Sequence, residues 1–365
     1  MLEGIVNSAL ENTGAAVAPK PDEGLMSNDS VRIAVVGVGG GGCNTVNRIA
    51  RSGIKSATTI AINTDYLQLK TIESQKKVLI GASITKGLGA GGFPEIAQKC
   101  AEASREKLSE ALGENEIVFL TAGMGGGTGT GAAPIVAKMA RDAGAVVVSI
   151  VTYPFALERA RIKKAQWGLE QLVEASDTVI VIDNNRLVNY APNIPINDAF
   201  NLADAITARA VKGIADTIMF PSLMNVDYAD VKSVMTGGGV ALISVGEGKG
   251  SDRVEQVVTS TLSHPLLDVS YEGATGALLH VEGSTSLTLG EAITIGDKVS
   301  ESFDANANVK IGARLVPDMG DLVTVTSIVT GLKQSPSIFG KPKESSDGAA
   351  SQKGMFAMES ASSIF

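Results

Sequence analysis

The sequence contains no long apolar segment and little of the chemistry that cysteine and histidine provide. No stretch approaches the roughly 18 apolar residues of a membrane-spanning helix, the densest being 145–151, so direct membrane insertion is not expected. Two cysteines, Cys43 and Cys100, cannot build a disulfide framework, which predicts a protein of the reducing cytosol. The two histidines, His264 and His280, lie far apart with no cysteine beside them. This argues against a zinc site and against a histidine-based triad.

Basic charge and aromatic side chains are also scarce, whereas glycine is abundant. The chain has 31 basic and 39 acidic residues, a net charge of −8, so nucleic acid is not expected as its main partner. Aromatic residues make up 4% of the chain, and the 44% of apolar residues indicates a folded globular body. The 41 glycines cluster at 37–42, 87–92, 123–131 and 237–239. Such clusters mark places where the backbone approaches another group closely or adopts a positive φ.

The order of apolar and amphipathic segments predicts an α/β protein of about two domains. From Val31 onward, nearly continuous apolar strands alternate with amphipathic helices, one of them expected as a single long helix over about 93–112. This pattern is typical of a doubly wound parallel sheet covered on both faces. The predicted division is an N-terminal extension 1–29, the doubly wound domain 30–198, a long connecting helix 199–222 ended by Pro221, a smaller α+β C-terminal domain 223–332, and a flexible tail 333–365.

The first glycine cluster, 37–42, follows a strand and opens a helix. It fits the pattern G-x-G-x-x-G, which places backbone N–H groups at the positive end of a helix. A dinucleotide enzyme would use such a loop, with Asp65 as the ribose-binding acid, although Asp65 lies 28 residues beyond Gly37. Close packing of the helix on the strand, without any ligand, explains the same glycines. The loop by itself leaves both interpretations open.

The second cluster, 125–131, also lies between a strand and a helix. Its five glycines and two threonines offer a ring of N–H donors and two hydroxyls, enough to surround a di- or triphosphate. Lysine is missing from both clusters, so neither is a Walker A loop. Backbone amides and helix dipoles must therefore provide what the lysine provides in P-loop proteins.

The sequence around this second cluster, AGMGGGTGTGAAP, resembles the glycine-rich signature of the tubulin/FtsZ family. Other motifs of that family follow in the family's order, namely VVGVGGGGCNTV, AINTD, GLGAGG, TYPF and LMNVDYADVKSVM. The resemblance extends from about Val31 to Leu332 and is nearer to FtsZ proteins, in detail to the archaeal ones, than to eukaryotic tubulin. It implies a GTP-hydrolysing cytoskeletal protein that binds GTP or GDP with Mg²⁺. It also implies head-to-tail self-assembly into filaments of the cell-division ring, in the cytoplasm at the division site beneath the membrane.

The resemblance also implies particular site residues in domain 30–198. The phosphates and the guanine edge would be held by Gly39, Gly40, Gly41, Gly42, Cys43 and Asn44, the γ-phosphate by Gly91 and Gly92, and the phosphate chain by Gly125, Gly126, Gly127, Thr128, Gly129, Thr130 and Gly131. Glu158 and Arg161 would contact the ribose and a nearby phosphate. Asn63 and Asp65 would orient a magnesium-bound water, although an Asn-Thr-Asp sequence after a strand is equally typical of a helix cap.

Base recognition is assigned by the resemblance to Phe200 and Asp204. Phe200 would stack on the base, and the Asp204 carboxylate would accept the N1–H and N2–H₂ donors of guanine, so that ATP is rejected. Three departures from the family pattern bear on these assignments. The segment 158–161 is one residue shorter than usual, Cys43 replaces the usual Gly or Asn, and Ala205 stands where many relatives carry an acid.

The motif NVDYAD at 225–230 supplies Asn225, Asp227 and Asp230 as the catalytic group implied by the resemblance. A helix cap with charge in its first turn explains the same residues. Asp227 lies 23 residues beyond Asp204, about 30 Å along a helix, and so cannot reach its own nucleotide. A neighbouring subunit stacked head to tail would have to supply the acids, and such a contact generates an open filament. A non-hydrolysing nucleotide-binding scaffold and an NAD-dependent oxidoreductase, the latter supported by 37–42 alone, are the alternatives.

The tail ends in an apolar cluster, 355–365, after a segment rich in Ser, Gly and Lys. We expect this cluster to dock on an adaptor that anchors the protein to a membrane, with the preceding residues as a tether. A terminal segment without a role is the alternative. Deletion of 341–365 should separate the two.

Overall fold

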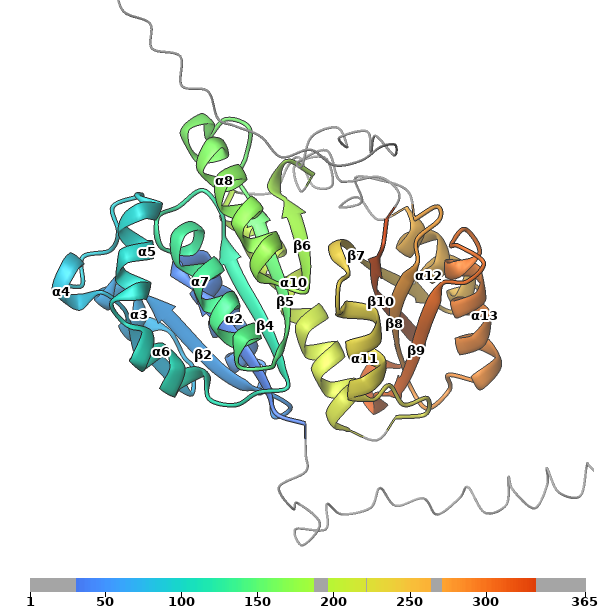
Figure 1. Ribbon diagram of the computed structural model, residues 1–365. Helices are drawn as coiled ribbons and strands as arrows, with labels where there is room; N and C mark the ends of the chain where they lie inside the picture. Colours follow the sequence, from blue (N-terminus) through green and yellow to red (C-terminus); the bar gives the residue numbers. More distant parts are fainter. Residues whose placement is uncertain (1–30, 187–195, 221, 264–270, 333–365) are drawn as a thin grey trace, which may run out of the picture.

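The computed structural model describes residues 31–186, 196–220, 222–263 and 271–332, without the side chains of 196–202 and 318. Two lobes lie side by side and share one ten-stranded sheet, with the strand order β3-β2-β1-β4-β5-β6-β7-β10-β8-β9 (Figure 1). The predicted N-terminal extension and tail lie outside the described residues. No helix among the described residues is long and apolar enough to cross a membrane.

The first lobe is the doubly wound part of the molecule, and its six strands are parallel. The strands are β1 (Ile33–Val38), β2 (Thr58–Asn63), β3 (Lys76–Leu79), β4 (Ile117–Gly123), β5 (Val146–Tyr153) and β6 (Thr178–Asp183). The helices are α2 (Gly39–Arg51), α3 (Tyr66–Thr71), α4 (Ala82–Thr85), α5 (Pro94–Glu102), α6 (Arg105–Leu112), α7 (Thr128–Asp142) and α8 (Arg159–Ala175). This confirms the predicted α/β class.

Successive strand residues bury their side chains on opposite faces of the sheet, as strand geometry requires. Val36 and Leu120 belong to the core under α5, α7 and α8, whereas Val35 and Phe119 belong to the core under α2 and α10. Figure 1 shows α7 and α8 in front of the sheet and α2 behind it. A strand buried on both faces needs a continuous apolar sequence, which is why these segments lack the alternation of an exposed strand.

The prediction of one long helix over 93–112 is wrong. The helix is interrupted between α5 and α6 at Ala103 and Ser104. The hydroxyl of Ser104 accepts a hydrogen bond from the backbone N–H of Gly81 at 3.0 Å. Gly81 also approaches Cys100 so closely that a Cβ on the glycine would lie 2.2 Å from the Cys100 sulfur. This tertiary contact with a distant loop favours the break in the helix. The apolar periodicity of the segment does not predict the break, because the contact involves a residue outside the segment.

The connecting helix α10 (Ile196–Met219) lies between the lobes, starting three residues earlier and ending three residues earlier than predicted. Its broad apolar surface is buried, as Val211 and Ile214 show. Asp216 joins α10 to both lobes, since its carboxylate accepts hydrogen bonds from Ser56 at 2.6 Å and from Arg314 at 2.8 Å. Burial alone would raise the pKa of Asp216, but these bonds and that from Lys212 outweigh it and hold the pKa below its usual value.

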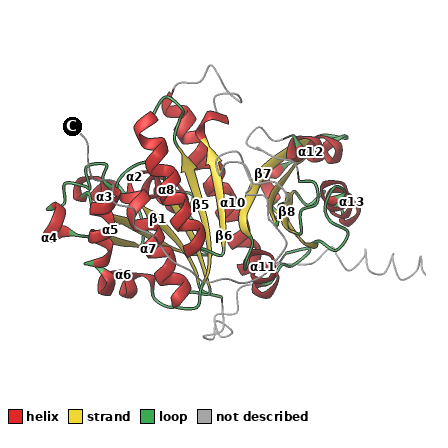
Figure 2. Cartoon of the chain, turned by 45° about the horizontal axis from the view of Figure 1, so that its top comes forward, coloured by secondary structure: helices red, strands yellow, loops and turns green. Residues whose placement is uncertain are grey.

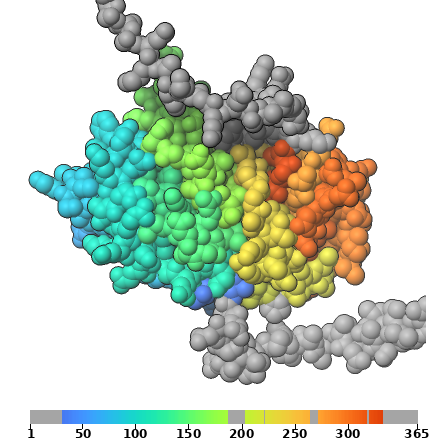
Figure 3. Space-filling view, viewed as in Figure 1, coloured from blue at the N-terminus to red at the C-terminus, as the bar shows by residue number. Residues whose placement is uncertain are grey.

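The second lobe is a mixed sheet that continues the first. It contains β7 (Gly239–Lys249), β8 (Gly276–Gly283), β9 (Asn308–Leu315), β10 (Leu322–Thr330), α11 (Tyr228–Met235), α12 (Arg253–Leu262) and α13 (Leu289–Ser300), with a short 3-10 turn at Pro317–Met319. β7 pairs in parallel with β6 and antiparallel with β10, so the two lobes are connected by strand pairing. Figure 2 shows α12 and α13 on the outer side of β8, and the space-filling view in Figure 3 shows the two lobes in contact where their boundary is visible.

Candidate functional site

A cleft of about 940 Å³ opens at the carboxyl ends of the parallel strands of the first lobe. Doubly wound sheets bind their ligands at this edge, because the loops and helix N-termini converge there. Fourteen predicted site residues line it, namely Gly40, Gly41, Asn44, Asn63, Asp65, Gly91, Gly92, Gly126, Gly127, Thr128, Gly129, Glu158, Arg161 and Asp204. The structure thus brings together residues from five separate loops and α10.

The first glycine loop divides into residues that face the cleft and residues that pack. Gly40, Gly41 and Asn44 line the cleft at the start of α2. Gly42 instead packs on β4, where a Cβ would lie 2.1 Å from the Thr121 carbonyl oxygen. Gly39 has φ +73° and lies against the backbone of the second loop. The packing interpretation therefore fits Gly39 and Gly42, while Gly40, Gly41 and Asn44 are open to a ligand.

Cys43 points away from the cleft into the core. Its thiol is fully buried and donates to the carbonyl oxygens of Gly37 at 3.7 Å and Ile62 at 3.5 Å. Burial raises the pKa of this thiol to about 12, so it stays protonated at physiological pH. Cys43 therefore lies behind the loop and does not line the cleft.

The second glycine loop forms the floor of the cleft and the start of α7. Gly126, Gly127, Thr128 and Gly129 line the cleft. The other three predicted residues of the loop, Gly125, Thr130 and Gly131, shape it. The Thr130 hydroxyl accepts a hydrogen bond from the backbone N–H of Gly125 at 2.8 Å, and a Cβ on Gly131 would lie 2.0 Å from the Pro94 carbonyl oxygen. The N-termini of α2 and α7 therefore converge on one cleft, an arrangement that favours an anion.

Asn63 and Asp65 line the cleft, and Asp65 also caps a helix. The Asp65 carboxylate accepts the backbone N–H of Gln68 at 3.0 Å as the N-cap of α3. The Asn63 amide donates to the Gln68 side chain at 2.7 Å. The cap interpretation of the Asn-Thr-Asp sequence is thus correct for Asp65. The Asn63 amide oxygen accepts the backbone N–H groups of Thr64 at 2.8 Å and Asp65 at 3.3 Å, and the role of both residues towards a ligand stays a prediction.

The start of α8 places an ion pair at the cleft and a lysine beside it. Arg161 and Glu158 form an ion pair of 2.7 Å at the cleft, despite the shortened segment that carries them. One turn further, the Lys164 ammonium group donates to the Gly92 carbonyl oxygen at 2.6 Å and lies 5.5 Å from the centre of the Phe93 ring. Sequence reasoning did not identify Lys164, because 72 residues separate it from Gly92 and the two residues belong to no common motif.

Asp204 reaches the cleft from α10, and its environment suits a hydrogen-bond acceptor. The Thr45 hydroxyl donates to one carboxylate oxygen of Asp204 at 2.7 Å. Burial raises the pKa of Asp204 above its usual value, although the Thr45 hydrogen bond and the charge of Arg48 counteract it. Phe200 belongs to α10, but its side chain lies outside the described part of the structure.

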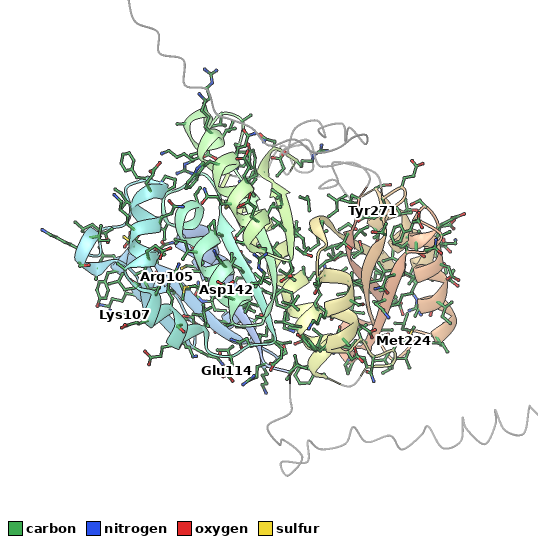
Figure 4. The ribbon with its side chains drawn as sticks, viewed as in Figure 1. Arg105, Lys107, Glu114, Asp142, Met224 and Tyr271 are labelled. Carbon is green, nitrogen blue, oxygen red and sulfur yellow. The ribbon has the colours of Figure 1, made fainter. Side chains whose placement is uncertain are left out.

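The residues of the acid loop, which we define as 222–230, do not line this cleft. Asp227 is the N-cap of α11, accepting the Asp230 N–H at 2.8 Å, and the Asp230 carboxylate accepts the Asp227 N–H in return. Asn225 accepts the Ser222 N–H at 2.8 Å. The helix-cap interpretation therefore describes correctly the hydrogen bonds that Asp227 and Asp230 make within their own chain. Met224 of the loop lies at the lower end of the second lobe in Figure 4, beyond the end of α10 that is remote from Asp204.

Nine further residues line the cleft that were not among the predicted ones. They are Gln68, Leu88, Gly89, Gly123, Met124, Thr152, Pro154, Asn184 and Ala203. Gly89 and Gly123 belong to glycine clusters already visible in the sequence. Thr152 and Asn184 lie at the carboxyl ends of β5 and β6, so the general rule for parallel sheets could have found them.

Comparison with known proteins gives family matches over both lobes. The model of the "Tubulin/FtsZ family, GTPase domain" matches residues 32–192, and that of the "FtsZ family, C-terminal domain" matches 239–333. A "Cell division protein FtsZ 2" of Methanocaldococcus jannaschii is 57% identical over 313 residues, 85% of this chain and 82% of the relative. A "Cell division protein FtsZ 2" of Halobacterium salinarum is 48% identical over 340 residues, 93% of this chain and 86% of the relative.

Solved structures agree with the sequence relatives. One described as "FtsZ dimer, empty (M. jannaschii)" superposes with a TM-score of 0.82 at 39% identity, covering 96% of this chain and 98% of that chain. A more distant one, "CetZ2 from Haloferax volcanii - GTPgS bound protofilament", has a TM-score of 0.71 at 21% identity, covering 84% and 94%, and shows the shared fold alone.

Proposed function

The chain belongs to the tubulin/FtsZ family of cell-division cytoskeletal GTPases, and from this membership we propose that it hydrolyses GTP as a filament of the division ring. The proposal places it in the cytoplasm, at the division site beneath the membrane. The observation that carries it is the cleft in which two glycine-rich helix N-termini meet the Asp204 carboxylate. The solved structure that is 39% identical to this chain is described as a dimer, which supports self-association.

In the proposed complex the backbone amides at the starts of α2 and α7 bind the phosphate chain. Arg161 adds the positive charge that the lysine-free loops lack, and the loop that carries Gly91 and Gly92 closes around the γ-phosphate. Asp204 accepts the guanine donors with the carboxylate oxygen that Thr45 does not occupy. In the reaction the oxygen of a water attacks the γ-phosphorus, the bond to the β,γ-bridging oxygen breaks, and the proton of the water leaves to a carboxylate or to phosphate.

Mg²⁺ fits the chemistry of the cleft in part. Asp65 offers a carboxylate oxygen, the type of ligand that this hard cation prefers, whereas the Asn63 amide oxygen already accepts two backbone N–H groups. The described residues contain no group of three or more His, Cys, Asp or Glu side chains able to hold a metal, so phosphate and water oxygens would supply most of the coordination. When bound, the ion would neutralise charge on the phosphates, while Asn63 and Asp65 would orient its water ligands.

Hydrolysis requires the acid loop of a neighbouring subunit in this proposal. Asp227 and Asp230 lie outside the cleft of their own chain, at the far end of α10. A head-to-tail neighbour brings this loop to the γ-phosphate and completes the site, with Asn225 helping to shape the loop. Because the two surfaces in contact differ, the assembly does not close on itself and grows as a filament.

Light scattering combined with phosphate release tests this function. Purified protein is mixed with Mg²⁺ and with GTP, ATP or NAD. The three nucleotides are compared over a range of protein concentrations. We expect scattering and phosphate with GTP, and turnover per subunit that rises with protein concentration. Assembly without phosphate would favour the non-hydrolysing scaffold, and neither signal with GTP at high protein concentration would overturn the proposal.

Replacement of Lys164 should weaken the preference for GTP over GDP. Because Lys164 holds the Gly92 carbonyl, Lys164→Met should release the loop that encloses the γ-phosphate. We expect GTP affinity to fall about tenfold, the loss of one charge-assisted hydrogen bond, with GDP affinity nearly unchanged. Lys163→Met is the matched control, since Lys163 is exposed and makes no hydrogen bond or ion pair with any described residue. Equal losses for GTP and GDP in competition binding would contradict this role.

The apolar end of the tail is proposed to recruit a membrane-anchored adaptor. Residues 355–365 lie outside the described part of the structure, and the proposal rests on their sequence. Deletion of 341–365 should leave GTP turnover and assembly unchanged and abolish recruitment to membranes in cells. Recruitment at the normal level by the shortened chain would discard this proposal.

A further inference from the structure

The edge strand β9 holds the acid loop in place, both through its backbone and through one of its faces. Among the described strands, β9 is the last of the sheet and pairs on one side with β8. On its other side Met224 of the acid loop exchanges two backbone hydrogen bonds with Ala313, of 3.2 and 3.0 Å. Gly312 permits the close approach, because a Cβ there would lie 3.0 Å from the Val226 side chain. The loop is thus seated on the strand by backbone contacts.

Four alternate residues of β9, which share a face of the strand, continue this contact along the loop. Asn308 donates to the Ser233 hydroxyl at 2.9 Å, and Arg314 lies 5.3 Å from the centre of the Phe220 ring. Between them lie Gly312 and Lys310, whose ammonium group is 2.8 Å from the Asp230 carboxylate. The face therefore contacts the chain from Phe220 at the end of α10 to Ser233 in α11.

Of these contacts, the one between Lys310 and Asp230 bears on the proposed GTP hydrolysis, because Asp230 is one of the proposed catalytic acids. Both side chains are about a third exposed, 34% and 29%, so the pair lies at the surface where a neighbouring molecule can meet it. The second oxygen of Asp230 accepts a longer bond of 3.3 Å from the Asp227 N–H. The hydrogen bond from Lys310 is the main reason why the pKa of Asp230 lies below its usual value. A carboxylate of this kind is a weak proton acceptor, which suits it to orienting a water.

We propose that Lys310 is a positioning residue, which fixes the Asp230 carboxylate in the orientation that meets the γ-phosphate site of the neighbouring subunit. The inference rests on the proposed function, since it assumes that the acid loop completes a neighbour's site. Without Lys310 the carboxylate is free to rotate, because the remaining bond to the Asp227 N–H is long. Small displacements of a reacting group lower turnover strongly while leaving substrate binding intact.

The test compares GTP turnover by filaments of the full chain carrying Lys310→Met, Lys310→Arg or Lys298→Met. We expect Lys310→Met to lower kcat about tenfold with KM, GTP binding and assembly unchanged. Lys310→Arg should restore most of the turnover, because arginine also donates to the carboxylate. The acid limb of the kcat profile should move to higher pH in Lys310→Met, because Asp230 then titrates nearer its usual pKa. Lys298→Met is the control, since Lys298 is exposed on α13 and makes no hydrogen bond or ion pair with any described residue.

Two further measurements separate the failure of this inference from the failure of the proposed function. Full turnover by Asp230→Asn would overturn the acid-loop function itself. An inactive Asp230→Asn together with a fully active Lys310→Met would overturn the role of Lys310 alone, as would equal losses in Lys310→Met and Lys310→Arg. Thermal unfolding checks each variant. If Lys310→Met does not fold, Lys310→Gln at the same surface position gives the same comparison.

Discussion

Asp227→Asn is expected to bind GTP and assemble normally while losing at least about a hundredfold in turnover, the usual contribution of a positioned acid–base group. The change is chosen because Asp227 has two interpretations, a helix cap and a catalytic carboxylate. Asparagine caps helices as well as aspartate does, so α11 should keep its stability. Asp227→Ala and Asp230→Ala should lose turnover as well, and their filaments should persist longer because GTP is not consumed. Phosphate release and sedimentation, measured in parallel, give both quantities.

Mixing two inactive variants tests whether the acids act on a neighbour. Subunits with Asp230→Ala keep the nucleotide cleft, and subunits with bulkier residues in place of Gly126 and Gly127 keep the acid loop. A mixed filament contains some interfaces that join an intact cleft to an intact loop, so partial but not full turnover should return. Turnover that is independent of protein concentration in the unaltered chain would contradict the shared site, because a self-contained enzyme behaves in that way.

Asp204→Ala should weaken GTP binding and reduce the preference over ATP by at least about a hundredfold. The prediction follows from a site that pairs with donor groups of its ligand, and such sites reject analogues that leave a buried polar group unpaired. Thr45 holds the carboxylate in place, so its free oxygen has a fixed direction. Competition binding of GDP and ADP measures the preference. Ala205→Asp in the Asp204→Ala background tests whether an acid at the neighbouring position restores it. If Asp204→Ala keeps its preference for GTP over ATP, the base-binding role has been assigned to the wrong position of α10.

The same carboxylate predicts how guanine binding depends on pH. Burial raises the pKa of Asp204, so the group takes up a proton at a higher pH than an ordinary aspartate. The protonated form carries a hydroxyl and accepts one guanine donor poorly, so GDP affinity should fall as the pH is lowered through this raised pKa. Asp204→Asn cannot titrate at this position. It therefore serves as the control that shows the pH dependence contributed by the phosphates of GDP alone. Identical pH profiles for the two proteins would contradict this assignment.

Local sequence patterns were enough to predict the class of the fold and the general place of the cleft. Continuous apolar strands, amphipathic helices and glycine clusters are local signals, since each depends on residues within one element and its turn. The motif AGMGGGTGTGAAP and the acid motif NVDYAD are local in the same sense. The helix-cap interpretations of Asp65 and Asp227 could be formulated from the sequence for this reason, and both proved correct.

Which residues of a motif face the cleft and which pack depends on contacts between distant segments. Gly41 and Gly42 are neighbours in one loop, yet one lines the cleft and the other lies against the Thr121 carbonyl, because the start of a helix turns successive residues in different directions. The pairs Lys164 with Gly92 and Lys310 with Asp230 join positions 72 and 80 residues apart. Such contacts depend on how the sheet brings its strands and helices together, and a contact between distant segments leaves no periodic pattern in either of them.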